Sequence, residues 1–498
     1  PALENLNQST FDLLEQYLEN GGQVISFGEL PFLLNGDETE KIDSLQQLHT
    51  NRWQIYDNPE SPQWLSRLAQ VDFRVENAGQ IGGELYHHRR ILEDGELIFW
   101  MNYSADEAAE LQFSMPGESM LLLNLQDGKV YEYPAAYSDG QLTTTINLPP
   151  GGSKLLFAHE ENYDASPEPF QTPVSGGEQV NAQSASITRN APNVLPLDYC
   201  NLNIMGKQFR DMYYIAATDS IYRFHGFDRA SVDHNPWNFA VQYKQELVER
   251  NNFPDGSGFT VEFPFRVASD YEPSEMKLAV EWGHLYTITV NGQAVDEPLN
   301  EEWLDNSINL YDISELVQPG SNSISLECRP MDIHAELERV FLVGDFNIQP
   351  TDGGFTIQNP GALEFGSWHN QGLPFYSESV TYIQRIQVTE PDTPHIVRLP
   401  DWRGTVAAIR VNGSDAGIIG WKPYELDITE HLTNDENQIE VTVYGSFKNL
   451  LGPHHNVNRY GIVTPWSWNS APAGQPAGAT YDLFKYGLME NFQVISYN

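Results

Sequence analysis

The chain has 498 residues, with 27 Lys or Arg against 69 Asp or Glu, so its formal net charge is -42. A surface this acidic repels nucleic-acid phosphates and anionic lipids, which argues against both as partners. Hydrophobic residues make up 40% of the chain, enough to form folded cores, and the length suits about three or four domains. No run approaches the roughly 18 apolar residues that span a bilayer.

Residues 1–78 are predicted to be a partial α/β segment that ends an upstream domain. Apolar residues with helical spacing follow Thr10, a candidate N-cap, and Gly21 and Gly22 end this helix. The sequence QVISFG, at 23–28, then indicates a short buried strand. A second helix is predicted at SPQWLSRLAQ, residues 61–70.

Residues 79–161 are predicted to form a β-sandwich. The hydrophobic period changes to two in segments such as LIFWMNYS, AELQFSM and LTTTINL, and Gly, Pro, Asp and Asn separate these segments. The following stretch, residues 162–186, is rich in Pro, Ser, Gly and Gln and is predicted to be a linker.

The rest of the chain contains a tandem repeat. Residues 287–295 read TITVNGQAV, and the similar AAIRVNGSDAG follows at 407–417. After each Asn-Gly pair come a polar loop, an Asp before an Ile (Asp312 and Asp427) and a strand with period two (NSISL and NQIEV). Asn-Gly predicts a hairpin turn, and Asp predicts a cap on a short helical turn.

The repeat indicates two antiparallel jelly rolls, at residues 187–350 and 351–498. The predicted fold is therefore mainly β, with tandem β-sandwich or jelly-roll domains preceded by a small partial α/β segment. Asn291, Gly292, Asn412, Gly413 and the two aspartates are interpreted as turn and cap residues rather than a functional site.

Cys200 and Cys328 are the only cysteines. They could form one bridge within the first jelly roll, but two buried free thiols are expected, since two cysteines do not make a disulfide scaffold. The sequence has no G-x-S-x-G, H-E-x-x-H, P-loop, G-x-G-x-x-G after a strand, C-x-x-C or EF-hand loop, so no catalytic residue is assigned.

Two aromatic clusters are candidate sugar-binding sites, since a sugar needs a flat apolar face beside directional polar groups. One is GPHHNVNRYGIVTPWSWN, and the other precedes a helix predicted near Pro236. The alternative for the first cluster is a loop folded over the sandwich with its histidines bonded to backbone, and for the second a capped helix start. The candidate substrate-binding residues are His454, His455, Arg459, Trp466, Trp421 and Trp237.

Several segments resemble the C-terminal region of large bacterial glycoside hydrolases of the α-L-rhamnosidase type, glycoside hydrolase family 106. They are VFLVGDFNI, GSWHNQGLPFYSESVTY, NLLGPHHN and YDLFKYGL, together with the second repeat. The resemblance implies galactose-binding-like jelly rolls. It also implies catalytic carboxylates on an upstream (β/α)8 barrel, so no family acid or base can be assigned to this chain.

The first functional hypothesis is therefore the accessory part of a glycoside hydrolase, with an upstream catalytic domain or N-terminal fragment as partner and a polysaccharide's terminal sugars as ligand. The second is a stand-alone carbohydrate-binding or adhesive surface protein, and the third is a structural extracellular module. The resemblance implies a bacterial extracellular or periplasmic location, and the acidity favours a saline setting. The resemblance also implies a structural Ca²⁺, but no loop of the sequence shows a spacing of ligands that would identify its site.

Overall fold

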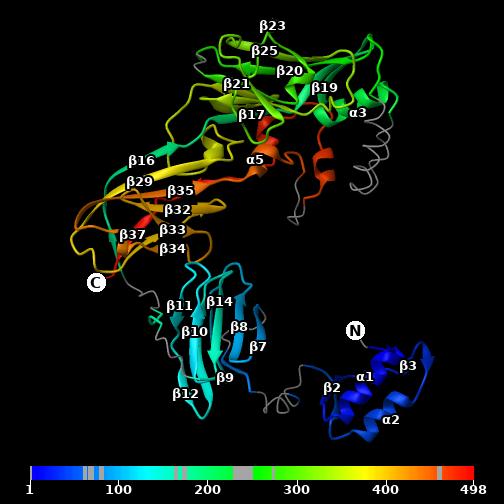
Figure 1. Ribbon diagram of the computed structural model, residues 1–498, viewed down its shortest axis with the longest axis vertical. Coiled ribbons are helices and arrows are strands. Elements are labelled where there is room, and N and C mark those ends of the chain that lie inside the picture. Colours follow the sequence, from blue (N-terminus) through cyan, green and yellow to red (C-terminus); the bar gives the residue numbers. More distant parts are fainter. Residues whose placement is uncertain are drawn as a thin grey trace. The chain divides into compact units, whose positions relative to one another are not determined.

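The computed structural model describes residues 3–59, 64, 72–77, 84–161, 167–170, 177–227, 251–271, 275–456 and 463–497 (Figure 1). The chain divides into two compact units, Pro1–Thr172 and Pro173–Asn498. Strands dominate both units and a small α/β segment begins the first, which confirms the predicted fold class. The helices predicted at 61–70 and near Pro236 lie outside the described residues.

The α/β segment contains two helices around one small core. Helix α1 (Gln8–Glu19) begins one turn earlier than predicted, because Asn7 and not Thr10 is its N-cap. The Asn7 side chain accepts a hydrogen bond of 2.9 Å from the backbone N–H of Thr10. Strand β2 (Val24–Phe27) is parallel to β5 (Trp53–Tyr56). The other elements are α2 (Lys41–Leu48), β1 (Asn5–Leu6), β3 (Leu33–Leu34) and β4 (Asp37–Glu38).

The β-sandwich of the first unit has two antiparallel sheets, with strand orders β11-β10-β14-β8-β7 and β12-β13-β9-β6. Its strands are β6 (Arg74–Asn77), β7 (Leu85–Ile91), β8 (Gly95–Asn102), β9 (Ala109–Pro116), β10 (Ser119–Leu123), β11 (Val130–Glu132), β12 (Ala136–Ser138), β13 (Gln141–Leu148) and β14 (Ser153–His159). Inward residues such as Ile98, Phe113 and Leu156 are fully buried. Strand β6 falls in the range predicted for the α/β segment but pairs with β9.

The first jelly roll of the second unit has a four-stranded sheet, β17-β26-β21-β24, and a larger sheet built on β19-β18-β20-β25-β22-β23. Its elements are β17 (Asn193–Leu197), β18 (Tyr199–Ile204), β19 (Lys207–Tyr213), α3 (Tyr214–Phe224), β20 (Phe259–Val267), β21 (Met276–Glu281), β22 (Thr287–Val290), β23 (Gln293–Ala294), β24 (Ile308–Asp312), β25 (Gly320–Cys328), β26 (Val340–Gly344), β27 (Asn347–Thr351) and β28 (Gly354–Gln358). Cys200 and Cys328 are buried free thiols in its core, as expected.

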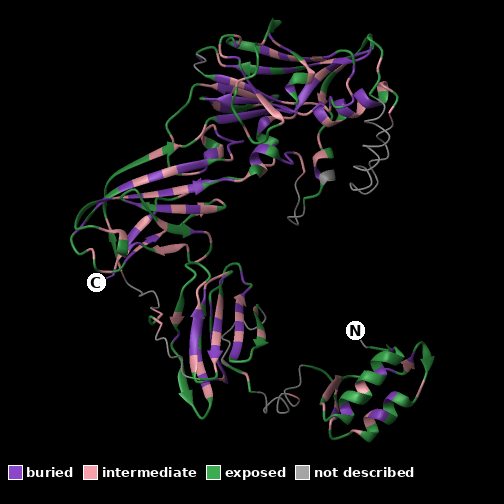
Figure 2. Cartoon of the chain, in the orientation of Figure 1, coloured by how far each residue is buried: buried purple, intermediate pink, exposed green. Residues whose placement is uncertain are grey.

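The second jelly roll has sheets of order β15-β37-β30-β34 and β16-β29-β35-β32-β33. Its elements are β15 (Glu178–Val180), β16 (Ala182–Arg189), η6 (Trp368–Gln371), β29 (Ser379–Val388), β30 (His395–Arg398), β31 (Trp402–Arg403), β32 (Val406–Val411), β33 (Ser414–Ile419), β34 (Glu425–Asp427), η7 (Thr429–His431), β35 (Asp435–Tyr444), α5 (Phe447–Leu451), η8 (Pro465–Asn469), η9 (Gly478–Thr480), β36 (Gly487–Leu488) and β37 (Gln493–Ser496). In both jelly rolls the buried residues gather between the sheets (Figure 2).

The first jelly roll is inserted into the second. Strand β16 pairs with β29, and β15 pairs with β37, although the whole first jelly roll lies between β16 and β29 in the sequence. The predicted linker at 162–186 is therefore wrong from Glu178 onward. The sequence AQSASITR of β16 is polar and mostly exposed, so it carries no apolar alternation that would reveal a strand.

The repeated turns fold as predicted. Asn291 and Asn412 have φ of 52° and 53°, and the glycines after them have φ of 79° and 81°. Positive φ at two consecutive central residues is the signature of a type I′ turn. Each Asn side chain also bonds a buried Asn of the next strand, at 2.8 Å in both copies (Asn322 and Asn437). The predicted caps also form, since Asp312 accepts from the N–H of Ser314 and Asp427 from that of Thr429.

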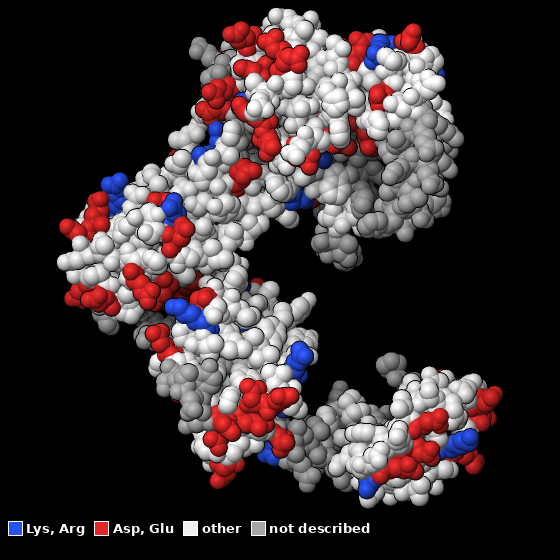
Figure 3. Space-filling model, viewed as in Figure 1, with Lys and Arg blue, Asp and Glu red and all other residues white. Residues whose placement is uncertain are grey.

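Acidic side chains are spread over several parts of the visible surface, and the few basic groups lie among them (Figure 3). Among the described residues, no helix is long and apolar enough to cross a membrane.

Candidate functional site

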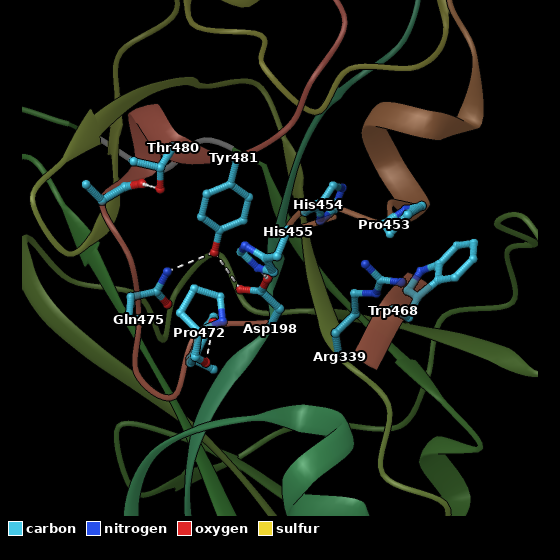
Figure 4. Close-up of polar contacts among 12 residues, drawn as sticks. Asp198, Arg339, Pro453, His454, His455, Trp468, Pro472, Gln475, Thr480 and Tyr481 are labelled. Carbon is cyan, nitrogen blue, oxygen red and sulfur yellow. Dashed lines mark hydrogen bonds and ion pairs between the residues drawn. The ribbon is translucent and has the colours of Figure 1, made fainter. Parts of the chain in front are cut away.

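A buried polar network joins the first jelly roll to the C-terminal segment that follows α5 (Figure 4). Asp198, between β17 and β18, is 2% exposed, and its carboxylate accepts two hydrogen bonds. One comes from the hydroxyl of Tyr481 at 2.8 Å, and the other from Nε2 of His455 at 3.0 Å. Gln475 donates from its amide to the Tyr481 oxygen at 2.8 Å. Both carboxylate oxygens are therefore engaged within the protein.

Burial sets the protonation states around this network. Desolvation, with the Asp198 charge second, raises the pKa of Tyr481 far above its ordinary value, so its hydroxyl remains a donor. The same two causes raise the pKa of the Cys200 thiol to about 12. Cys200 is therefore a core residue rather than a nucleophile.

His454, next to this network, is 2% exposed and donates from Nε2 to the backbone carbonyl of Asn449 at 2.8 Å. Burial, followed by the charge of Arg339, lowers its pKa well below the ordinary range, so the imidazole is neutral. The guanidinium of Arg339 donates to the carbonyl of Leu451 at 2.7 Å. The Arg339 contact joins the end of α5 to the first jelly roll, whereas His454 is bonded to α5 itself.

A cavity of about 370 Å³ adjoins the network. On one side of β20, β18 pairs with residues 259–262 and β28 pairs with residues 266 and 267. Neither strand pairs with the intervening residues, and Pro264 there has no N–H to donate. The strands on this side of β20 thus leave a gap at this point, and Gln475 and Tyr481 from the C-terminal segment are among the residues that line the cavity.

The cavity combines apolar and polar groups. Phe265, Phe355 and Pro264 give it apolar walls, while Asn201, Asp211 and Arg266 supply amide, carboxylate and guanidinium groups. Asp211 has a left-handed backbone with φ of 56°, and it accepts a hydrogen bond from the N–H of Gln475 at 3.0 Å. Such a mixed lining suits a small polyhydroxylated molecule.

The structure separates the predicted sugar-binding residues. His454 and His455 come together: His454 is buried and bonded to backbone, as in the folded-loop alternative, whereas His455 is half-buried and bonded to the side chain of Asp198. Trp421 is 51% exposed in the loop between β33 and β34. Arg459 and Trp237 lie outside the described residues, and for Trp466 only the backbone, in η8, is described.

Sequence reasoning missed Asp198, Gln475 and Tyr481. A signal for Asp198 is present in NVLPLDYCNLNI, where one acid stands within an apolar, strand-like run. An acid in such a position needs buried partners. Among the described residues, no three His, Cys, Asp or Glu side chains gather into a group that could hold a metal ion, and the structural Ca²⁺ stays a prediction.

Comparison with known proteins gives partial similarities. No family model matches the chain. A protein of Formosa agariphila named "Putative beta-glucuronidase" is 27% identical over 118 residues, which cover 22% of this chain and 10% of that protein. The chain thus spans about a tenth of the length of this relative.

Solved structures give lower identities. A rhamnosidase from Novosphingobium sp. PP1Y matches 99% of this chain and 32% of its own, with 14% identity and a TM-score of 0.45. A Streptomyces avermitilis α-L-rhamnosidase complexed with L-rhamnose matches 78% of this chain and 31% of its own, with 11% identity and a TM-score of 0.22. The similar proteins are thus glycoside hydrolases by name, of which this chain spans about a third or less.

Proposed function

We propose that this chain is a non-catalytic, carbohydrate-binding part of a glycoside hydrolase of the α-L-rhamnosidase type. The observation that carries the proposal is the cavity beside β20, which places Asn201, Asp211 and Arg266 around apolar walls. Amide, carboxylate and guanidinium groups can bond the hydroxyls of a sugar, and Pro264 and Phe355 can contact its C–H face. The partial sequence match to the Formosa agariphila protein, which is named a putative beta-glucuronidase, supports a glycoside hydrolase but not the rhamnosidase type.

The same cavity argues against catalysis by this chain. Glycoside hydrolysis needs a pair of carboxyl groups, one to protonate the leaving oxygen and one to act as nucleophile or base. Asp198 has both oxygens bonded to Tyr481 and His455, so of the two acids that line the cavity only Asp211 could contact a ligand, where the reaction needs a pair. Under this proposal the reacting carboxyl groups belong to a catalytic domain upstream, and the whole protein acts on polysaccharide outside the cytoplasm.

The test is to compare binding and hydrolysis by the chain. Isothermal titration with oligosaccharides of a rhamnose-containing polysaccharide should show binding, and aryl α-L-rhamnosides should show no turnover. Asn201→Ala and Arg266→Ala should each weaken binding about fivefold to tenfold, the loss of one hydrogen bond. Arg410→Ala, at an exposed ion pair of the second jelly roll, is the matched control and should leave binding unchanged.

Turnover by the chain alone would contradict the non-catalytic assignment. If no oligosaccharide binds, the carbohydrate-binding role fails and a purely structural role replaces it. Binding to many unrelated surface glycans without any effect of the two variants would favour the stand-alone adhesive protein.

A further inference from the structure

The two sheets of the β-sandwich in the first unit differ in their outer faces. Side chains alternate between the two faces of a strand, so the residues that stand between core residues point away from the core. In the sheet that contains β9 and β13, these outward residues are polar or charged: Glu110, Gln112, Ser114, Thr143, Thr145 and Asn147. This is the ordinary pattern of an antiparallel sheet with one face in water.

The other sheet is apolar on its outer side. Core residues such as Ile98 on β8 and Leu156 on β14 alternate with residues that lie outside the core of the sandwich. We name the apolar ones among them the outer apolar face: Leu97, Phe99, Met101, Leu155, Phe157, Leu121 and Leu123. All except Leu121 are partly exposed, in bands that alternate with buried residues (Figure 2). A contiguous apolar surface of this kind marks an interaction site.

The two edges of this face carry opposite charges. At one edge, the pairing of β7 with β8 places His88 and Arg90 on the outer side. At the other edge, the pairing of β11 with β10 places Val130 and Glu132 on the same side. Both Arg90 and Glu132 are exposed. Glu132 is also the one acid at the described outward positions of the five strands.

The strand register arranges these charges at the ends of one row. Arg90 is opposite Leu97, Leu97 is opposite Phe157, Phe157 is opposite Leu121, and Leu121 is opposite Glu132. The row therefore begins with a guanidinium, continues through three apolar side chains and ends with a carboxylate. Phe157 is at its centre, because β14 is the middle strand of the five.

A row of this kind is complementary to itself. A two-fold axis that runs along β14 in the plane of contact reverses the strand order, so that β7 of one copy faces β11 of the other. Arg90 then meets the partner's Glu132, and the reverse pair forms at the opposite edge. Phe157 meets the partner's Phe157 on the axis. Two sheets that pack face to face in this way have nearly aligned strands.

We infer that the outer apolar face is the interface of a homodimer, in which two copies of this sheet pack face to face with β7 of each against β11 of the other. The inference goes beyond the proposed function and does not depend on it. Five strands of about seven residues cover roughly 24 Å by 24 Å, so the two faces bury on the order of 1,000 Å² in total, the lower end for a specific interface. The net charge of -42 opposes association as well. The dimer is therefore weak and depends on protein concentration.

The experiment is sedimentation equilibrium of the whole chain over a range of concentrations, at about 0.15 M salt so that repulsion between distant acidic groups is screened. The wild-type chain should show a monomer–dimer equilibrium. Arg90→Glu and Glu132→Arg should each weaken dimerisation at least about tenfold, because each variant places like charges together at both edges. An equimolar mixture of the two variants should restore the dimer, since each edge then pairs a Glu with an Arg.

Arg403→Glu is the matched control, because Arg403 is exposed on β31 of the second jelly roll, and it should leave the equilibrium unchanged. Phe157→Ser should weaken dimerisation at least about tenfold, since two copies of this side chain meet on the axis. A chain that stays monomeric at every concentration would overturn the inference. So would a dimer that neither charge variant weakens, or one that the mixture does not restore. None of these outcomes involves sugar binding, so the proposed function is tested separately.

Discussion

The two jelly rolls of the second unit share their turn chemistry but differ in what covers them. In each, an Asn at positive φ bonds a buried Asn of the neighbouring strand, Asn322 in the first and Asn437 in the second. Only the first roll has the buried Asp198 network, which binds it to the C-terminal segment. The repeated local sequence therefore gives both rolls the same turns, while long-range contacts such as those of Asp198 distinguish the first roll.

The largest effect should come from breaking the feature that the rolls do not share. Asp198→Ala leaves His455 and the Tyr481 hydroxyl buried without their acceptor and should lower the free energy of unfolding by about 3–5 kcal/mol. Glu436→Ala, which removes an exposed ion pair with Arg385, is the control and should cost at most about 1 kcal/mol. Urea denaturation measures both. Equal losses for the two variants would mean that the buried network does not hold the C-terminal segment.

The shared feature should give smaller and matched effects. Asn437→Ala leaves the N–H and carbonyl of Thr433 without their side-chain partner, and Asn322→Ala does the same to Gln318. Each should lower the free energy of unfolding by about 2–3 kcal/mol. Hydrogen exchange should locate each loss in its own roll. A loss in one variant only would show that the repeat is equivalent in geometry but not in energy.

The smallest expected effect is a pH dependence of the free energy of unfolding that comes from His454. The unfolded chain protonates His454 near pH 6.5, whereas in the folded protein its pKa is much lower because of burial. The contribution of neutral His454 to the free energy of unfolding is therefore complete above pH 6.5. Below pH 6.5 the unfolded chain binds the proton more readily, so stability falls by at most about 1.4 kcal/mol per pH unit. Denaturation at a series of pH values measures this slope.

His454→Gln should remove that part of the slope, since glutamine does not titrate. His284→Gln, at an exposed position of the first roll, should keep it. An unchanged slope in His454→Gln would assign the acid sensitivity to other groups. His454 would then not differ from the exposed His284 in its effect on stability.

The sequence predicted what is decided locally. The Asn-Gly turns and the Asp caps depend on backbone preferences of a few adjacent residues, so both copies could be recognised before any tertiary contact was known. The partner of His455 could not be found in this way, because Asp198 lies 257 positions away. The cavity beside β20 was hidden for the same reason, since β18, β20 and the C-terminal segment come together only in the folded unit.

The insertion of the first jelly roll has a consequence for biosynthesis. On a ribosome that adds about 5–20 residues per second, β16 must wait roughly 10–40 s for β29, because about 190 residues separate Arg189 from Ser379. An apolar strand left unpaired for that time would invite association with other nascent chains. The polar sequence AQSASITR keeps this edge soluble during the delay. The composition that made β16 resemble a linker thus protects the chain until its sheet can close.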